Sequence, residues 1–260
     1  MVNKAAIGGK GVVMSVEQDI QTFRQWINEA EPGSVVFFGG AGVSTESGIP
    51  DFRSADGLYS LKYPVSPEEM ISRTYFDLHP EQFFEFYFDR MIARDAMPNR
   101  AHKKLAQLEE QGTLSCVITQ NIDGLHQKAG SRKVHELHGS VLRNFCMECG
   151  RPYDLDAMIE LHENASDGVP RCPVCGAIVK PDVVLYEESL DGRVIEESIR
   201  AIARAKTLIV AGTSLVVYPA AGFIDYFNGD HLVIVNFSPT GRDKSADLCI
   251  AASIGDVLDF

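Results

Sequence analysis

Residues 35–44 read VVFFGGAGVS, four consecutive apolar residues followed at once by a glycine-rich turn. An apolar run that ends in glycines is typical of a buried strand in a parallel sheet. Glycines after such a strand let the backbone approach a pyrophosphate, and a helix beyond them offers free N–H groups. An ordinary tight turn between strand and helix is the alternative. The spacing is not the usual Gly-x-Gly-x-x-Gly, and no acidic residue stands at a following strand end about 20 residues on, which weakens the case for a dehydrogenase.

Similar apolar runs recur along the chain and alternate with helical patterns. The runs cover residues 115–119, 207–211 and 231–236, and the helical patterns cover residues 101–111, 195–205 and 220–227. Strands that alternate with helices predict an α/β fold with a Rossmann-like, doubly wound parallel sheet. Before the first strand, Ser15 and Gln18 have the spacing of a capping box, so we expect a helix from about Val16.

Two segments interrupt this alternation, and we expect them to pack together as a smaller domain. Residues 58–100 are rich in Phe, Tyr and Met with a helical pattern from about Pro80, and residues 141–180 hold four of the six cysteines. The predicted large domain is made of residues 15–57, 101–140 and 181–260, and residues 1–14 are predicted to be a flexible tail.

Composition and charge narrow the classes of function. The chain has 260 residues and a formal net charge of −12. It lacks a run of roughly 18 apolar residues, which a membrane span needs. It also lacks the apolar segment of a secretory signal, so we expect a cytoplasmic protein. The acidic charge favours basic partners, such as lysine-rich protein segments, and disfavours direct binding of nucleic acid.

The strongest signal from spacing alone is a pair of Cys-x-x-Cys motifs, Cys146/Cys149 and Cys172/Cys175. Two such motifs place four thiolates around a tetrahedral Zn²⁺. Four cysteines leave no position for water, so the predicted zinc is structural rather than catalytic. Redox or disulfide chemistry is the alternative, and a reducing cytosol disfavours it. Cys116 and Cys249 lie in apolar runs, so we expect both to be buried in the core.

Polar residues follow the second predicted strand. Gln120, Asn121 and Asp123 come directly after it, where side chains of a parallel sheet face the ligand crevice. A capped turn that starts a helix is an equally good reading of these residue types. His138 follows a predicted strand at 132–137, and an imidazole that titrates near neutral pH suits a general base. We expect the other singled-out histidines to be structural: His102, His126, His135, His162 and His231.

Taken together, these segments resemble the sirtuin family. Residues 40–53 match its GAGxSxxSGIPDFR signature, residues 119–126 its TQNIDxLH motif, and residues 136–139 its ELHG motif. Residues 212–220 are similar to its GTSLxVxPA segment, and Asn236 to its late strand-end asparagine. The resemblance implies an NAD-dependent protein-lysine deacylase that forms nicotinamide, O-acyl-ADP-ribose and free lysine. It also implies that the smaller domain combines a helical insertion with a zinc ribbon.

Roles for individual residues also come from the resemblance. His138 would be the general base that takes a proton from the nicotinamide ribose, and Asn121 would assist it. The predicted metal ligands are the four paired cysteines. The implied NAD-binding residues are Gly40, Ala41, Ser44, Thr45, Asp51, Phe52, Arg53, Gln120, Asn121, Ile122, Asp123, Gly212, Thr213, Ser214, Asn236 and Phe237.

The predicted acyl-lysine groove departs from the family pattern. The segment Lys180–Glu188 matches the family stretch whose backbone pairs with the substrate peptide as an added strand. Val184 and Tyr186 would therefore contact substrate. Tyr186 stands where the family has Phe, and Glu187 where it has Gly. A negative Glu187 would favour basic residues beside the acyl-lysine. The alternative is that Glu187 faces solvent and does not affect the choice of peptide.

A more specific hypothesis concerns Tyr87 and Arg90. Three residues apart in a predicted helix, they would share one face. They align with the Tyr-x-x-Arg pair of sirtuins that remove succinyl or malonyl groups, where Arg pairs with the acyl carboxylate. The alternative is an aromatic core stripe with a surface arginine.

Two other functions compete with deacylation. The first is mono-ADP-ribosyl transfer at the same site, which would label protein without acyl-lysine. The second is a non-catalytic nucleotide sensor whose zinc ribbon binds a partner. The presence of Asn121, Asp123 and His138 argues against a sensor, since binding alone needs no general base.

Overall fold

The computed structural model describes residues 15–51, 57 and 65–260, and Phe52 and Arg53 therefore lie outside the described residues. The first part of the chain forms α1 (Val16–Asn28), β1 (Val35–Gly39), η1 (Ala41–Val43), η2 (Thr45–Ser47), α2 (Pro67–Met70), α3 (Arg73–Leu78), α4 (Pro80–Phe86), the π-helical η4 (Tyr87–Met91), α5 (Arg100–Glu110), β2 (Leu114–Thr119) and α6 (Leu125–Ala129). The rest forms β3 (Val134–Glu136), β4 (Gly139–Cys146), β5 (Pro152–Asp154), α7 (Leu155–Glu163), β6 (Val179–Val183), α8 (Gly192–Arg204), β7 (Thr207–Ala211), η5 (Ala220–Tyr226), β8 (His231–Val235), η6 (Asp243–Ser245), β9 (Leu248–Ile250) and α9 (Ile254–Val257).

Six of the described strands form one parallel sheet, here called the large sheet, in the order β3-β2-β1-β7-β8-β9. Successive strand residues face opposite sides of this sheet. Phe37, Val117 and Ile209 pack with α1, α5 and α9 on one side. Phe38 and Val210 belong to the cluster on the other side, with α8 and η5. Both faces are covered, which is why these strands are continuous apolar runs. The predicted doubly wound fold is confirmed.

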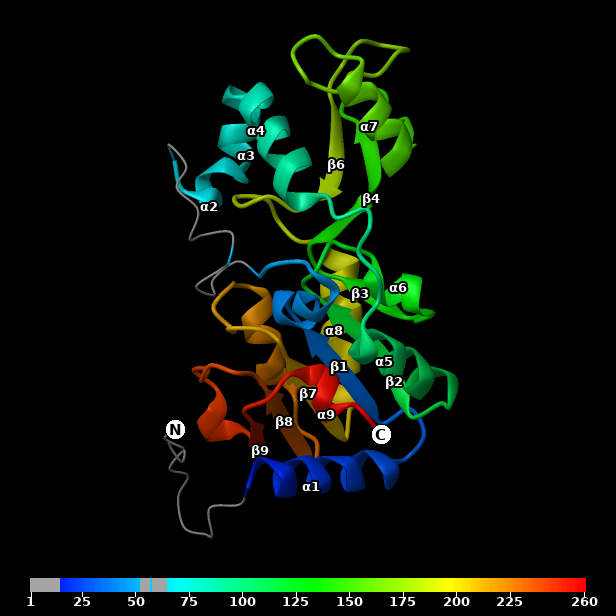
Figure 1. Ribbon diagram of the computed structural model, residues 1–260, viewed down its shortest axis with the longest axis vertical. Helices are drawn as coiled ribbons and strands as arrows, with labels where there is room; N and C mark the ends of the chain where they lie inside the picture. The colour runs from blue at the N-terminus through cyan, green and yellow to red at the C-terminus, as the bar shows by residue number, and fades with distance from the viewer. Residues whose placement is uncertain (1–14, 52–56, 58–64) are drawn as a thin grey trace.

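Three of the described strands form an antiparallel sheet, here called the small sheet, in the order β5-β4-β6. It lies with α2, α3, α4 and α7 at the end of the molecule opposite α1 (Figure 1). Phe84 from the helical insertion, Met158 of α7 and Val179 of β6 share one buried cluster, so the two interrupting segments pack together. The domain boundaries remain a prediction, and those at 140/141 and 180/181 fall inside β4 and β6.

Local signals explain most helix boundaries. The capping box at Ser15 and Gln18 is present, with Gln18 N 3.3 Å from Ser15 Oγ. The segment at 220–227 is a 3-10 helix rather than an α-helix. Two short helices, α2 and α3, precede the expected start at Pro80, and serines at positions 66 and 72 cap them.

The expectation that Cys249 is buried is wrong, whereas Cys116 is buried as predicted. Cys249 is the middle residue of β9, an edge strand of the large sheet, and its two neighbours are buried while it is exposed. An edge strand of three residues follows the alternation of inward and outward side chains. Within the described residues, no helix is both long and apolar enough to cross a bilayer.

Candidate active site

The glycine-rich turn after β1 packs against the turn after β7. Gly42 N donates to Gly212 O at 2.8 Å. A Cβ added to Gly42 would lie 2.7 Å from Gly212 Cα, and one added to Gly40 would lie 2.7 Å from Thr213 Cβ. Gly212 itself has a φ of +59°, a conformation that favours glycine. These glycines are therefore required for the fit between two strand-end turns, in addition to any ligand.

The expected helix beyond the glycines is replaced by two short 3-10 turns, η1 and η2, with Ser44 between them. Ser44 is 1% exposed, and its Oγ donates to Asp123 Oδ2 at 2.6 Å. Asn121 Nδ2 donates to the same Ser44 Oγ at 3.0 Å. Asp123 Oδ1 accepts from Leu125 N at 2.9 Å. Three residues predicted separately from two motifs thus form one hydrogen-bonded network at the ends of β1 and β2.

His138 lies between β3 and β4, beside the same strand ends. Its Nδ1 is 2.8 Å from the carbonyl oxygen of Gln120, and a carbonyl can only accept. Nδ1 therefore carries the proton, and in the neutral ring Nε2 is the unprotonated nitrogen. Burial lowers the pKa of His138 below its usual value, and the hydrogen bond to Gln120 partly offsets this shift. The imidazole is therefore neutral at pH 7, the form that a general base needs.

The surroundings of His138 hold it in place through both neighbouring strands. Leu137 N donates to Thr119 O at 2.9 Å, and Val184 N donates to His138 O at 3.0 Å. Glu136 Oε2 accepts from Arg143 Nη1 at 2.6 Å, which fixes the strand end just before His138. The histidine is thus fixed to the large sheet on one side and continues the β4–β6 pairing of the small sheet on the other.

The residues expected to hold the adenosine side follow β7 and β8. Thr213 Oγ1 accepts from Gln120 Nε2 at 3.0 Å, so this side is joined to the β2 end. Asn236 Nδ2 donates to Ser238 O at 2.8 Å. The Phe237 side chain is 74% exposed, so its ring is open to a planar ligand. Thr45, of η2, donates from Oγ1 to Gly42 O at 3.0 Å and stabilises the turn after β1.

The predicted substrate segment lies between His138 and the helical insertion. Tyr186 N donates to Ile71 O at 3.1 Å, and Arg73 N donates to Tyr186 O at 3.0 Å. Glu187 has a φ of +75°, in the left-handed region where the family glycine is unstrained. Its carboxylate accepts from Thr74 N at 2.8 Å and Thr74 Oγ1 at 2.7 Å. Glu187 is exposed but bound to Thr74, which neither sequence alternative anticipated.

Tyr87 and Arg90 are in different surroundings. Tyr87 is fully buried among Phe83, Phe84 and Phe88, and its hydroxyl has no hydrogen-bond partner among the described residues. Arg90 is 42% exposed in its side chain and pairs with Asp89 Oδ2 at 2.7 Å. The expectation of a shared helix face is wrong because residues 87–91 form a π-helix, whose wider turn separates positions three apart.

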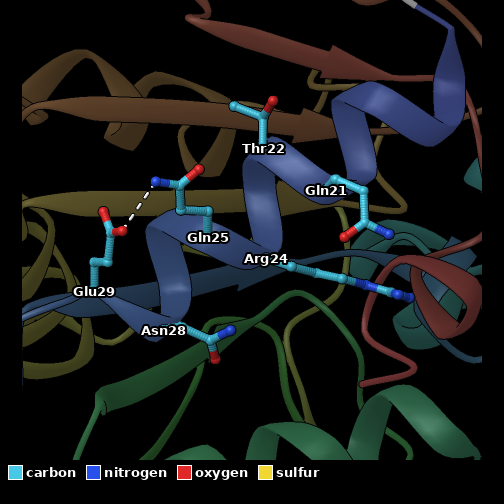
Figure 2. A pocket seen from close by; sticks show the side chains of 6 residues that line it. All are labelled: Gln21, Thr22, Arg24, Gln25, Asn28 and Glu29. Atoms are coloured by element: carbon cyan, nitrogen blue, oxygen red, sulfur yellow. Dashed lines mark hydrogen bonds between the residues drawn. The ribbon is translucent and has the colours of Figure 1, made fainter.

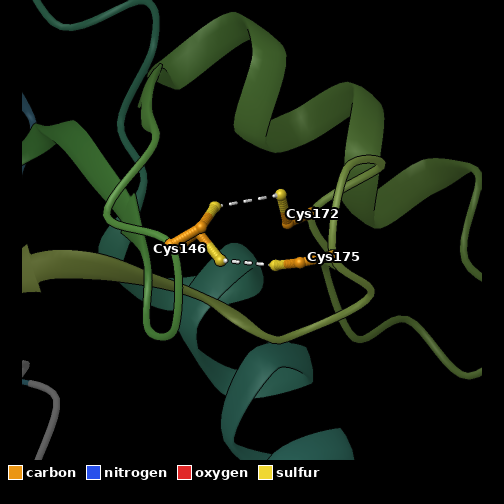
Figure 3. A group of neighbouring side chains, drawn as sticks. Cys146, Cys172 and Cys175 are labelled. Atoms are coloured by element: carbon orange, nitrogen blue, oxygen red, sulfur yellow. Dashed lines mark hydrogen bonds between the residues drawn. The ribbon is translucent and has the colours of Figure 1, made fainter.

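The four paired cysteines come together in the small sheet region, with all their Sγ atoms within 4.8 Å of one another. Sulfur atoms around a tetrahedral Zn²⁺ lie about 3.8 Å apart, since each metal–sulfur bond is about 2.3 Å. Cys146 and Cys175 are 3.3 Å apart and Cys149 and Cys172 are 3.7 Å apart. Figure 3 shows Cys172 and Cys175 of one loop facing Cys146 of the other. The donor set and spacing fit zinc, and all four cysteines are unpaired.

A hydrogen bond to one ligand supports this assignment. Tyr153 of β5 donates its hydroxyl to Cys172 Sγ at 3.1 Å. That bond is the main reason why the pKa of the Cys172 thiol is lowered to about 6. At Cys172 the thiolate, which is the form that binds metal, is therefore favoured, whereas the pKa of Cys175 is raised to about 12.

Two hollows lie away from these strand ends. One, of about 460 Å³, is on α1 at the end opposite the small sheet (Figures 1 and 2) and is lined by Gln21, Thr22, Arg24, Gln25, Asn28 and Glu29. The other, of about 530 Å³, is lined by Glu81, Gln82, Glu85, Phe88, Asp89, His162, Asp167 and Gly168. Neither includes a residue of the network around Ser44 and His138.

Sequence reasoning missed one residue that supports the turn after β1. Asn99 Nδ2 donates to Val43 O at 2.8 Å, and its Oδ1 caps α5 by accepting from Ala101 N at 3.0 Å. An asparagine before a helical pattern is a recognisable cap. Its second bond, to a residue 56 positions away, has no signal in the sequence.

Comparisons with known proteins agree with this arrangement. The Sir2 family profile matches residues 40–219. An NAD-dependent protein deacetylase of Clostridium acetobutylicum is 58% identical over 232 residues, covering 88% of this chain and 93% of that protein. A solved structure described as "Sir2-p53 peptide-NAD+" superposes with a TM-score of 0.81 at 39% identity, covering 92% of this chain and 95% of its own. "Structure of Sir2Tm bound to a propionylated peptide" gives a TM-score of 0.81 at 38% identity, with the same coverage.

Proposed function

The chain belongs to the Sir2 family, and from that premise we propose that it is an NAD-dependent protein-lysine deacylase whose main activity is deacetylation. The observation that carries the proposal is the neutral, oriented imidazole of His138 beside the Ser44–Asn121–Asp123 network. An NAD-consuming reaction needs a nucleotide site and a base at one place. The ends of β1, β2 and β7 bring both together, as expected for a ligand crevice in a parallel sheet.

The described residues suggest a division of labour. NAD supplies an electrophilic ribose carbon from which nicotinamide departs. The turns after β1 and β7 would lie against its phosphates, while the backbone N–H groups of Gly42 and Gly212 remain bonded within the chain. Asn121 and Asp123, fixed through Ser44, would orient the nicotinamide ribose and carboxamide. His138 would accept a ribose hydroxyl proton at Nε2, because Nδ1 already donates to Gln120 O.

Residues beyond the base would bind the rest of both substrates. Thr213, Ser214, Asn236 and Phe237 would contact the adenosine side. Val184 and Tyr186 would bind the acyl-lysine peptide next to His138, since Val184 N bonds to the His138 carbonyl. Asp51, Phe52 and Arg53 would complete the cofactor site. The net charge of −12 suits basic segments of protein substrates, and we propose a cytoplasmic location.

The range of acyl groups is a separate part of the proposal. One structural relative is bound to a propionylated peptide, so acyl groups larger than acetyl fit that protein. Succinyl and malonyl groups would need a cationic partner, and Arg90 is the candidate. Its ion pair with Asp89 competes with such a role. We therefore expect acetyl-lysine to be preferred, and succinyl-lysine turnover by the wild type to fall in Arg90→Met if Arg90 does bind the acyl carboxylate.

The decisive experiment measures NAD-dependent nicotinamide release with acetyl-lysine and succinyl-lysine versions of one peptide. His138→Ala should reduce the acetyl-dependent rate by about 10²- to 10⁴-fold, the usual contribution of a general base. His79→Ala, which removes an exposed histidine, is the matched control and should retain the wild-type rate. Release without acyl-lysine, together with labelling of protein, would favour ADP-ribosyl transfer. NAD binding without any release would favour a sensor.

A further inference from the structure

We propose that Glu187 is a positioning residue for the acyl-lysine substrate, which it serves by fixing the segment 184–188 to the first turn of α3. The proposal rests on the deacylase function proposed above and adds a residue to its substrate site. Glu187 and Leu215 are the non-glycine residues with positive φ among the described parts of the chain. A side chain in this conformation is strained, so surrounding contacts must stabilise it.

The contacts that hold Glu187 come from one residue. Its Oε2 accepts from both the backbone N and the Oγ1 of Thr74, at 2.8 and 2.7 Å. Thr74 lies in the first turn of α3, where backbone N–H groups have no partner within the helix. Ser72 caps Tyr75 N, so the two side chains serve different N–H groups. The carboxylate also suits the positive end of the helix.

The segment around Glu187 connects the catalytic histidine to the helical insertion. Val184 bonds to His138 O on one side, and Tyr186 forms a parallel bridge with Ser72 on the other. A shift of Tyr186 would therefore also displace Val184, which is bonded to His138. The bond from Glu187 to Thr74 is placed one residue beyond Tyr186 and restrains that shift.

The adjacent Glu188 makes different contacts from Glu187, so its bonds can be compared with those that the substitution removes. Its Oε2 accepts from Lys180 Nζ at 3.0 Å and from Leu185 N at 2.9 Å, so it ties the segment to β6. Its Oε1 accepts from Arg73 Nη1 at 3.2 Å. These bonds remain when only Glu187 is changed. The segment then loses its tie to Thr74 but keeps the backbone bonds of Tyr186 to Ile71 and Arg73, so its end is loosened rather than released.

A substrate that pairs with a fixed strand loses less conformational freedom on binding than one that must order the strand first. Loss of the Glu187–Thr74 contact should therefore weaken acyl-peptide binding. It should leave the chemical step and NAD binding unchanged, because His138 and the Ser44 network are held by other bonds.

Three single variants and one double variant test this. Glu187→Gly accepts a φ of +75° without strain and removes the side chain together with its carboxylate. We expect it to raise KM for an acetyl-lysine peptide by about three- to tenfold, the size of effect that the loss of one ordinary hydrogen bond produces. The kcat and the KM for NAD should stay within about twofold. Glu187→Gln keeps an acceptor oxygen and should restore most of the affinity. Thr74→Val removes the bond from Oγ1 and keeps the bond from the backbone N, so it should raise the peptide KM less than Glu187→Gly does. The double variant should be no worse than Glu187→Gly.

Hydrogen exchange supplies a readout that does not depend on turnover. In Glu187→Gly the amides of Thr74 and Tyr186 should exchange faster, while that of Leu137 should not change. An unchanged peptide KM in Glu187→Gly, with an active wild type, would overturn the inference and leave the deacylase function intact. Equal losses in peptide KM, NAD KM and kcat would also overturn it, because they indicate a general structural role. A wild type that releases no nicotinamide with acetyl-lysine would overturn the proposed function instead.

Discussion

The large sheet has a hydrophobic cluster on each face, built from its own strands and the helices that cover them. The small sheet shares a single main cluster with the helical insertion, and two zinc-type ligands, Cys146 and Cys172, belong to it. A metal bound by these cysteines would add to the stability that this single cluster supplies. A small sheet with limited apolar burial needs such an additional source of stability.

The two regions also contribute different halves of the proposed site. The turns after β1 and β7 are bonded to strands of the large sheet, and His138, the proposed base, is bonded to Gln120 directly after β2. The predicted peptide segment continues from β6 of the small sheet and is held by α3. We expect cofactor binding to depend on the buried core of the large sheet, and peptide binding to depend on the order of the metal-stabilised part.

Removal of the metal should have the largest effect and should separate the two halves. Structural zinc contributes about 10 kcal/mol or more to the folding of isolated zinc modules. Cys175→Ser, or chelation of the wild type, should therefore disorder the small sheet and abolish binding of acyl-lysine peptide. NAD should still bind to the large-sheet part within about tenfold of its original affinity. Zinc content, circular dichroism and calorimetric titration with each ligand would measure this.

The matched control is Cys249→Ser, which changes an exposed cysteine of β9 outside the metal cluster. It should keep one zinc per chain and bind both ligands normally. If Cys175→Ser lost NAD binding as completely as peptide binding, the two halves would not be independent, and the comparison between them would be wrong.

Acid should weaken the large-sheet part through buried histidines. Burial lowers the pKa of His102, and burial together with His102 lowers that of His126 to about 3. His138 is lowered by burial as well. Below pH 6.5 the unfolded chain binds protons that the folded chain does not. Stability present above pH 6.5 is therefore lost as the pH falls towards the folded pKa values, by up to about 1.4 kcal/mol per pH unit for each histidine.

Urea unfolding between pH 7.5 and 5.5 would measure this slope. His126→Leu should reduce the pH dependence of the free energy of unfolding by the contribution of one histidine. Neither ring nitrogen of His126 has a hydrogen-bond partner among the described residues. For the same reason the substitution should cost little at pH 7.5. A stability that is equal at both ends of this range would contradict the assignment of these rings as neutral.

Burial also explains which parts of the fold could be predicted. The apolar run at 207–211 has the same bounds as β7, and the run at 35–38 covers all of β1 except its last residue. These strands were predictable because a strand covered on both faces is an uninterrupted apolar run. The cysteine cluster follows from short-range spacing alone. Cys249 was misplaced because an apolar neighbourhood does not tell an edge strand from a central one.

The site was less accessible to local reasoning. The roles of Ser44 and His138 required the family resemblance, because the bonds that join Ser44 to Asp123 span 79 residues. The partner of Glu187 lies 113 residues away at Thr74, so the sequence left only the choice between solvent and substrate. The face shared by Tyr87 and Arg90 was inferred from α-helical geometry, and the π-helix changes that geometry.

The smallest effect on substrate binding should come from a substitution that loosens the turn after β1 while the chain stays folded. Asn99→Ser keeps a side-chain oxygen that caps α5 but is too short to donate to Val43 O. We expect KM for NAD to rise about two- to fivefold, the result of losing one neutral hydrogen bond, with no change in the KM for peptide. Asn99→Ala removes the cap too and should lower the free energy of unfolding by a further amount of about 1 kcal/mol.

If Asn99→Ser and Asn99→Ala had the same KM for NAD but differed in stability, the bond to Val43 would account for cofactor affinity and the cap for stability alone. A peptide KM that rose as much as the NAD KM would instead show that the turn after β1 serves both halves of the site, contrary to the division between the two sheets.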